Sequence, residues 1–237
     1  MSHLVSKQPW GTLDLDTNAG SIFFQEDWFY NWSVDVGASA WTLAQKRHFH
    51  NTLDKQIWGK WSNRFRLRVS GSTPFCRRFA ATGVPINFDI HWVLRPGHWT
   101  VNVRKLPAGS TPTTFISNVL FATRVINLDS ADLTPYSAGN AAGANNPRFA
   151  AGPHEFGHTF DNRDEYNAPA APRPPRSLGD LGRYAADVGA YVHDLALLLD
   201  SASILNIGTQ VRSRHLQLIV QALNALTPGC TWTAPIP

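Results

Sequence analysis

The sequence has little of what marks several classes of protein. Only two cysteines occur in 237 residues, Cys76 and Cys230, and they lie far apart. Their spacing does not decide whether they form a disulfide or remain free thiols. Residues 1–7 lack the apolar core of a Sec signal peptide, so we expect a cytoplasmic protein or one exported by a route other than Sec. No segment approaches the roughly 20 apolar residues of a transmembrane helix, so we expect no membrane span.

Charged residues are also scarce, at 16% of the chain, whereas hydrophobic residues make up 43%. This balance is typical of a globular protein rather than a disordered one. The net charge of +4 comes without a dense tract of lysine or arginine, so we expect no nucleic-acid partner. A chain of 237 residues fits one domain or two small ones.

The most informative segment that is present is the pentapeptide His-Glu-Phe-Gly-His at residues 154–158. Residues four apart share one face of a helix, so His154 and His158 can direct their rings at one metal ion. Glu155 projects beside them, where its carboxylate can take a proton from a water molecule activated by the metal. The pattern also occurs by chance, and an amphipathic helix with two surface histidines is the competing interpretation.

A catalytic zinc ion takes three protein ligands, so the motif needs a third. The chain continues with Asp161 and Asn162, which favour a turn because both tolerate a left-handed backbone. Asp164 falls six residues after the second histidine, where the returning chain would bring a ligand. Glu165 competes with it because it is adjacent and has the longer reach. We favour Asp164.

At residues 154–166 the pattern H-E-F-G-H-x-x-x-x-x-D-E-Y resembles zincin metallopeptidases of the metzincin-like kind. It is closest to the snapalysin-type variant, in which aspartate is the third ligand, and to related bacterial effector domains. The resemblance implies a zincin-like fold, zinc as cofactor, and His154, His158 and Asp164 as ligands. Asp161 stands where the family usually has glycine, a departure that aspartate can accommodate in a tight turn.

A second resemblance lies at residues 203–208, which read Ser-Ile-Leu-Asn-Ile-Gly. Metzincins have a turn beneath the metal, commonly Ser-Ile-Met-Asn, that packs a methionine under the ligands. Here Leu205 takes that position, and the chain's only methionine is Met1. Leucine is close to methionine in volume and apolarity, so we expect the packing role to survive. Residues 1–140 contribute nothing to the resemblance.

Hydrophobic periodicity predicts an α+β protein, and the resemblance implies that its mixed sheet is zincin-like. We expect a β-rich part over residues 1–140 and a helical part over residues 141–237 that carries the zinc site, together forming one catalytic domain. Strands are predicted at 21–24, paired with 28–36, and at 64–69, 85–94, 98–105 and 115–128, with a helix at 39–61. The turn at residues 95–97 predicts that its flanking strands form a hairpin. Zincins bind extended substrate along an edge strand above the metal, and residues 115–128 are the nearest upstream candidate.

The start of the active-site helix has two alternatives. Asn146 and Pro147 resemble an N-cap followed by a first-turn proline, whereas a helix starting at Pro153 would place His154 in its first turn. We expect a loop at residues 137–146 and a proline-rich loop beside the cleft at residues 167–176. Further helices are predicted at residues 180–200 and 211–226.

Motif and resemblance together predict a zinc metalloendopeptidase that acts on a protein or peptide substrate. Zinc would lower the pKa of its water towards about 7 and polarise the scissile carbonyl, with Glu155 as general base. Tyr166 and His215 are the two candidate donors to the oxyanion that forms. Compact zinc-protease domains also serve as bacterial effectors and toxins, which implies a secretion-system partner.

Three other functions fit the same residues. The zinc site could cleave a peptidoglycan amide, or it could be non-catalytic within a glycan- or protein-binding module, although the intact Glu155 argues against the second. A structural protein without metal is the third. Seven of the nine tryptophans precede residue 95. Aromatic clusters can stack on sugars, but large aromatic residues more often fill the core.

Overall fold

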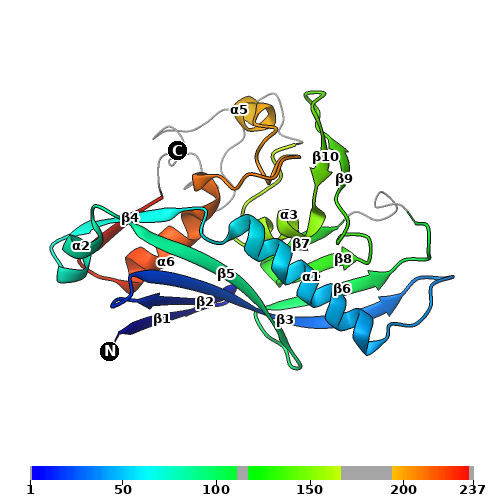
Figure 1. Ribbon diagram of the computed structural model, residues 1–237, viewed down its shortest axis with the longest axis horizontal. Helices are drawn as coiled ribbons and strands as arrows, with labels where there is room; N and C mark the ends of the chain where they lie inside the picture. The colour runs from blue at the N-terminus through cyan, green and yellow to red at the C-terminus, as the bar shows by residue number, and fades with distance from the viewer. Residues whose placement is uncertain (1, 111–116, 167–193, 235–237) are drawn as a thin grey trace.

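The computed structural model describes residues 2–110, 117–166 and 194–234. Within these ranges the protein is α+β, with a nine-stranded mixed sheet and a separate two-stranded one (Figure 1). The main sheet has the order β11-β4-β5-β3-β6-β8-β7, and β2 joins β3 while β1 joins β2. Its strands are β1 (His3–Gln8), β2 (Gly11–Asp16), β3 (Ser21–Val34), β4 (Arg66–Gly71), β5 (Val84–Val93), β6 (Trp99–Lys105), β7 (Asn118–Leu120), β8 (Val125–Asp129) and β11 (Cys230–Thr233).

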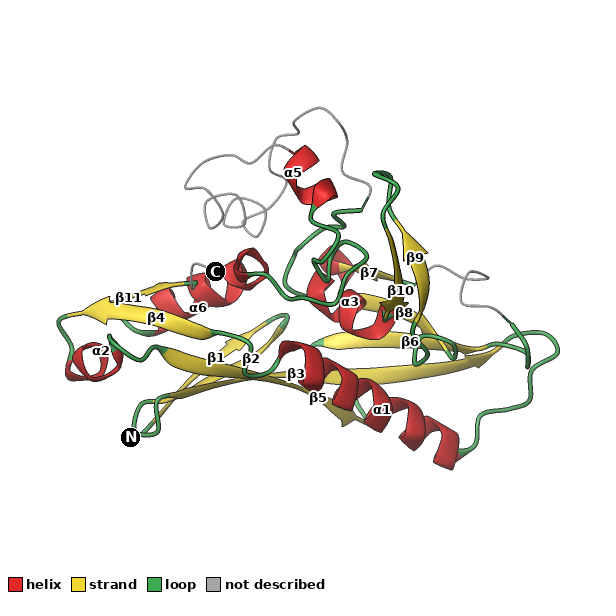
Figure 2. Ribbon diagram, turned by 45° about the horizontal axis from the view of Figure 1, so that its top comes forward, coloured by secondary structure: helices red, strands yellow, loops and turns green. Residues whose placement is uncertain are grey.

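The helices lie among and after these strands. They are α1 (Leu43–Trp61), α2 (Pro74–Phe79), α3 (Ala151–His158), α5 (Asp194–Leu199) and α6 (Gln217–Leu226), with 3-10 turns η2 (Phe121–Thr123) and η3 (Ser213–Leu216). In both overall views α3 lies between the main sheet and α5 (Figures 1 and 2). None of the helices in the described ranges has both the length and the apolar character needed to span a bilayer.

Strand β3 organises the sheet. It pairs in parallel with β5 over residues 22–29 on one side and with β6 over residues 28–34 on the other. The predicted strand pair at 21–24 and 28–36 is therefore wrong. Buried and less buried side chains alternate without a break through Phe24, Glu26 and Trp28. Residues 21–34 therefore form one continuous strand instead of two strands joined by a turn.

The predicted hairpin between β5 and β6 is also wrong, because β3 lies between these two parallel strands. The connection at residues 94–98 instead crosses over β3 at Asp27. A Cβ atom on Gly97 would lie 2.7 Å from the Asp27 carbonyl oxygen, so only glycine permits this approach. The Asp27 amide donates a hydrogen bond to His98 Nδ1 at 2.8 Å. The turn residues 95–97 thus belong to a connection that crosses over β3, rather than to a hairpin.

Helix α1 confirms the helix predicted at residues 39–61, with a later start. Thr42 caps it, since its side chain accepts from the Gln45 amide while the Gln45 side chain accepts from the Thr42 amide. The buried face carries Phe49, Leu53 and Ile57 and ends on Trp61. The Trp61 ring lies edge-on or tilted within 6 Å of Phe88, Phe156 and Phe160, joining α1, β5 and α3 in one aromatic core.

Most of the tryptophans belong to the interior. Trp28, Trp61, Trp99 and Trp232 are among the largest fully buried side chains of the described residues. Trp58, on the outer side of α1, is 46% exposed. The prediction that the aromatic residues mainly fill the core is confirmed for this set.

The predicted strand at residues 115–128 is two antiparallel strands joined by η2. Arg124 takes a left-handed conformation (φ 53°) where the chain turns into β8. Among the strands that the structure describes, β7 is the last on this side of the sheet. The expected loop at residues 137–146 is instead the hairpin of β9 (Tyr136–Gly139) and β10 (Asn145–Phe149). It escaped prediction because its strands, Tyr-Ser-Ala-Gly and Asn-Asn-Pro-Arg-Phe, lack a regular alternation of large apolar residues.

The C-terminal part returns to the main sheet. The helix predicted at 211–226 is η3 followed by α6, and its apolar stripe of Leu216, Ile219, Val220 and Leu223 is buried. β11 pairs with β4, and Cys230 forms a disulfide with Cys76 on α2. The proline-rich segment 167–176 and most of the helix predicted at 180–200 lie outside the described residues, and α5 is the described end of the latter.

A carboxylate is buried inside the sheet. Glu26 is 0% exposed, and Trp28 Nε1 donates to its Oε2 at 2.7 Å. Among the described residues its Oε1 has no hydrogen-bond partner. Burial raises the pKa of Glu26 from 4.5 to about 8, because nearby donors offset only part of the desolvation of the charged form.

We therefore expect stability to fall as pH rises from about 5 to about 8. The folded state keeps a proton that the unfolded state has lost, so unfolding releases it, at up to about 1.4 kcal/mol per pH unit. Glu26→Gln should remove this slope and raise the free energy of unfolding at pH 8. Denaturant unfolding of both proteins at each pH measures the difference, and parallel pH profiles would contradict the prediction.

Candidate metal centre

Helix α3 carries the histidine motif and begins at Ala151, between the two predicted starts. Asn146 and Pro147 belong to β10 instead of capping the helix. Pro153 is the third helical residue, where its missing amide removes no intrahelical hydrogen bond. All eight residues of α3 are buried, which rules out a surface helix with two solvent-facing histidines.

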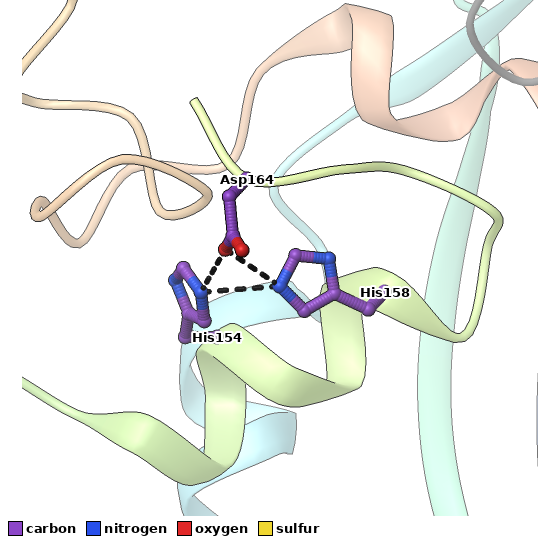
Figure 3. A group of neighbouring side chains, drawn as sticks. All are labelled: His154, His158 and Asp164. Carbon is purple, nitrogen blue, oxygen red and sulfur yellow. Dashed lines mark hydrogen bonds and ion pairs between the residues drawn. The ribbon is translucent and has the colours of Figure 1, made fainter. Parts of the chain in front are cut away.

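Three side chains converge beside α3 (Figure 3). His154 Nε2 lies 3.1 Å from His158 Nε2, and each of these nitrogens lies 3.1 Å from Asp164 Oδ1. Among the described residues they form the one group of three that could hold a metal ion. A tetrahedral zinc ion with bonds of 2.0–2.1 Å holds its ligand atoms about 3.3 Å apart, close to this triangle.

The Nδ1 atoms of His154 and His158, which point away from the cluster, both form hydrogen bonds with backbone carbonyls. His154 Nδ1 lies 2.6 Å from the Ile204 carbonyl oxygen, and His158 Nδ1 lies 2.9 Å from that of Asn162. A carbonyl only accepts, so each Nδ1 is the donor. In the neutral rings both Nε2 lone pairs then face the Asp164 carboxylate. Three acceptors so close together favour a cation among them, and histidine ligands of metals are typically held by carbonyls in this way.

The charge of Asp164 dominates the electrostatics of this cluster when no ion is bound. Burial would lower the pKa of His158, but the hydrogen bond and charge of Asp164 outweigh it and raise this pKa to about 9. Burial would likewise raise the pKa of Asp164, but hydrogen bonds with His154 and His158 hold it well below its usual range. The carboxylate is therefore charged and available as a ligand.

The turn after α3 brings Asp164 back to the helix. Asp161 has φ 59°, the left-handed conformation expected at the position where the resembling family has glycine. The Asn162 side-chain amide donates to the carbonyl oxygens of Gly157 (3.1 Å) and His215 (3.0 Å). These contacts hold the turn against α3 and η3.

Leu205 lies beneath α3. It is 0% exposed, and a Cβ atom on Gly157 would lie 2.6 Å from Leu205 Cδ2 and 2.9 Å from Trp61 Cζ2. The lack of a side chain at Gly157 therefore allows α3 to pack closely against Leu205 and Trp61. Ile204, the residue before, holds the ring of His154.

Glu155 is 6% exposed, and its Oε2 is buried without a hydrogen-bond partner among the described residues. Burial raises the pKa of Glu155, and the neighbouring His158 and His154 offset this only in part. A buried carboxylate oxygen normally has a donor, so an unpartnered one beside the cluster suits a group that accepts a proton from a bound molecule.

The structure separates the two candidates for the third ligand. Glu165 is 0% exposed and binds Arg214 through two hydrogen bonds of 2.9 Å, so its carboxylate is engaged away from the cluster. Of the two, Asp164 is the one whose carboxylate converges on the histidines.

The two candidate oxyanion donors are placed differently. Tyr166 lies beside the cluster, with its ring centroid 5.8 Å from that of His154, and burial and the charge of Asp164 raise the pKa of its hydroxyl. His215 is 0% exposed, with Nε2 3.4 Å from Glu165 Oε1 and 3.3 Å from Ser203 Oγ, and is not brought to the cluster.

Sequence reasoning missed Tyr136 on β9. Its ring packs on Phe149 (5.2 Å), which packs on His154 (4.9 Å). Burial and the charges of Asp132 and Glu155 raise the pKa of Tyr136 to about 12. No local motif marks this residue, because the β9–β10 hairpin brings it to the site. Comparison of the chain with protein-family models, curated proteins and solved structures finds no match.

Proposed function

We propose that this protein is a zinc-dependent metallopeptidase. The observation that carries the proposal is the convergence of His154 Nε2, His158 Nε2 and Asp164 Oδ1 at mutual distances of 3.1 Å. Two imidazoles and one carboxylate are a donor set that zinc accepts, and three protein ligands leave a position open for catalysis. A zincin-like fold is part of this proposal, supported by the buried motif helix beside a mixed sheet.

Zinc held by these residues would supply a Lewis acid and would lower the pKa of a bound water towards about 7. Glu155 accepts a proton through its unpartnered oxygen and passes it to the leaving amine. Tyr166, Tyr136 and Phe149 belong to one cluster of rings beside His154, next to the open metal position where a substrate would bind. The Tyr166 hydroxyl keeps its proton at neutral pH and can donate to an oxyanion.

A peptide is the substrate that the sheet edge supports best. β7 is the outermost strand on its side, and it pairs with β8 alone among the described strands. An extended peptide can add to such an edge through backbone hydrogen bonds. The tryptophans that would favour a glycan substrate are largely committed to the core.

An effector or toxin role, with delivery through a secretion system, is a further part of the proposal. The Cys76–Cys230 disulfide supports export, because disulfides persist in oxidising compartments and are rare in the cytosol.

Cleavage of a denatured protein should therefore depend on zinc. We expect the purified protein to hold about one zinc per chain, to lose cleavage on chelation and to regain it when zinc returns. Metal analysis with assays on denatured protein and on peptidoglycan measures this. Zinc far below one per chain would refute the enzyme, and cleavage of peptidoglycan alone would make the protein an amidase.

A further inference from the structure

Two adjacent carboxylates in the loop after α3 have different surroundings. The Asp164 side chain is 40% exposed, whereas that of Glu165 is 0% exposed. The Asp164 carboxylate contacts His154, His158 and the Tyr166 hydroxyl, but its side chain is the more exposed of the two. The buried Glu165 beside it is therefore the residue through which the loop backbone can be held.

Glu165 is held at both its backbone and its side chain. Its amide donates to the Leu205 carbonyl oxygen at 2.8 Å. Arg214 Nε and Nη2 each donate to its carboxylate at 2.9 Å, a two-point geometry that fixes orientation as well as position. Burial would raise the pKa of Glu165, but hydrogen bonds with His215 and Arg214 outweigh it, so the carboxylate stays charged.

The ion pair continues beyond Arg214. Arg214 Nη2 also donates to Asp200 Oδ2 at 2.7 Å, and Arg212 holds the same aspartate through Nε (2.8 Å) and Nη2 (2.6 Å). Glu165, Arg214 and Asp200 thus form an ion-pair relay, and Arg212 balances the negative charge that remains on it. Removing one member would leave a buried partner uncompensated.

The relay and the metal cluster share one support, the turn at residues 203–206. The Ile204 carbonyl accepts from the ring of His154, and the Leu205 carbonyl accepts from the amide of Glu165. The same turn therefore orients one histidine and anchors the loop that carries Asp164.

We propose that Glu165 is the positioning residue of the metal centre, and that the Glu165–Arg214–Asp200 relay sets metal affinity by holding Asp164 in place. The inference rests on the proposed metal centre, and it assigns the two neighbouring carboxylates different tasks. Asp164 contacts the metal, and Glu165 does not. Outer partners of metal ligands typically contribute 10–100-fold in affinity.

The test measures zinc affinity directly, by competition with a chromophoric chelator, for the unchanged protein and for Glu165→Gln. Glutamine keeps the shape of the side chain but loses the charge that holds Arg214. We expect a Kd for zinc about 10–100-fold weaker. Added zinc should also raise the melting temperature of the variant less than that of the unchanged protein, because stabilisation by a ligand follows its affinity.

Arg214→Lys refines the test, since lysine keeps the charge but cannot bind both carboxylate oxygens in the same way. It should also weaken zinc binding. Asp14→Asn is the control, because Asp14 pairs with His3 on β1, outside the metal cluster, and its Kd should not change. A purely structural role for Glu165 would lower the melting temperature of the metal-free protein and leave the Kd of the folded protein unchanged.

A Kd within threefold of the unchanged protein for folded Glu165→Gln would overturn the inference and leave the proposed function standing. If Glu165→Gln does not fold, Asp200→Asn decides by the same criterion, since this aspartate is 22% exposed and less costly to change. Failure of the unchanged protein to bind zinc would overturn the proposed function, and this inference with it.

Discussion

Glu155→Gln should abolish hydrolysis while the protein keeps its zinc. An amide cannot take up the proton that the carboxylate accepts, and general bases of this kind contribute about 10²–10⁴-fold to the rate. Glu155 is not one of the three converging ligands, and glutamine has nearly the same volume. The rate of hydrolysis should therefore fall in this variant while its zinc content stays the same.

Stability should not fall in the same variant. The buried Oε2 of Glu155 has no partner among the described residues, and replacing a desolvated carboxylate with a neutral amide removes part of that cost. Replacing a buried functional residue of this kind often raises the stability of a protein while lowering its activity. The measurements are zinc per chain, cleavage of a denatured protein, and thermal unfolding. Retention of more than about a tenth of the rate would exclude Glu155 as the base.

Asp164→Ala should have the largest effect on metal content. It removes one of three ligand atoms and leaves two histidines whose Nε2 atoms lie 3.1 Å apart. We expect zinc affinity to fall by more than the roughly 100-fold that marks the upper range for outer partners. Dialysis against a weak chelator followed by metal analysis measures the loss, and cleavage should disappear with it.

Asp161→Gly is the matched control for this variant. Asp161 lies in the same loop, has φ 59° and is outside the ligand group. Glycine adopts this conformation without strain, so the control should keep its zinc and its activity. Zinc retained by Asp164→Ala and lost from Asp161→Gly would show that the turn, rather than the carboxylate, holds the metal.

Local patterns predicted the elements whose partners are close in sequence. The helix predicted at residues 39–61 is α1, whereas the capping pair of Thr42 and Gln45 that sets its later start was found only in the structure. The buried positions of α6 follow from its apolar periodicity. The left-handed Asp161 follows from the spacing of the motif, because a ligand six residues after His158 needs a sharp turn.

Strand pairing was predicted less well, because it depends on residues far apart in the chain. The turn at residues 95–97 has the composition of a hairpin, yet β3 lies between the flanking strands. β3 is 14 residues long, so it can pair with β5 over one half and with β6 over the other. Nothing local in β5 or β6 indicates that a third strand, some 60 residues earlier, separates them.

The sequence by itself determined the chemistry of the site. Helical geometry brings His154 and His158 together, and the following turn offers a carboxylate. Only the tertiary structure decided which carboxylate converges on the histidines. Asp164 and Glu165 are neighbours of the same charge, and what distinguishes them is Arg214, which lies 49 residues beyond Glu165 and neutralises it inside the core. Tertiary packing likewise buried His215 with Glu165 and brought Tyr136 towards His154, because contacts between distant segments leave no local pattern in the chain.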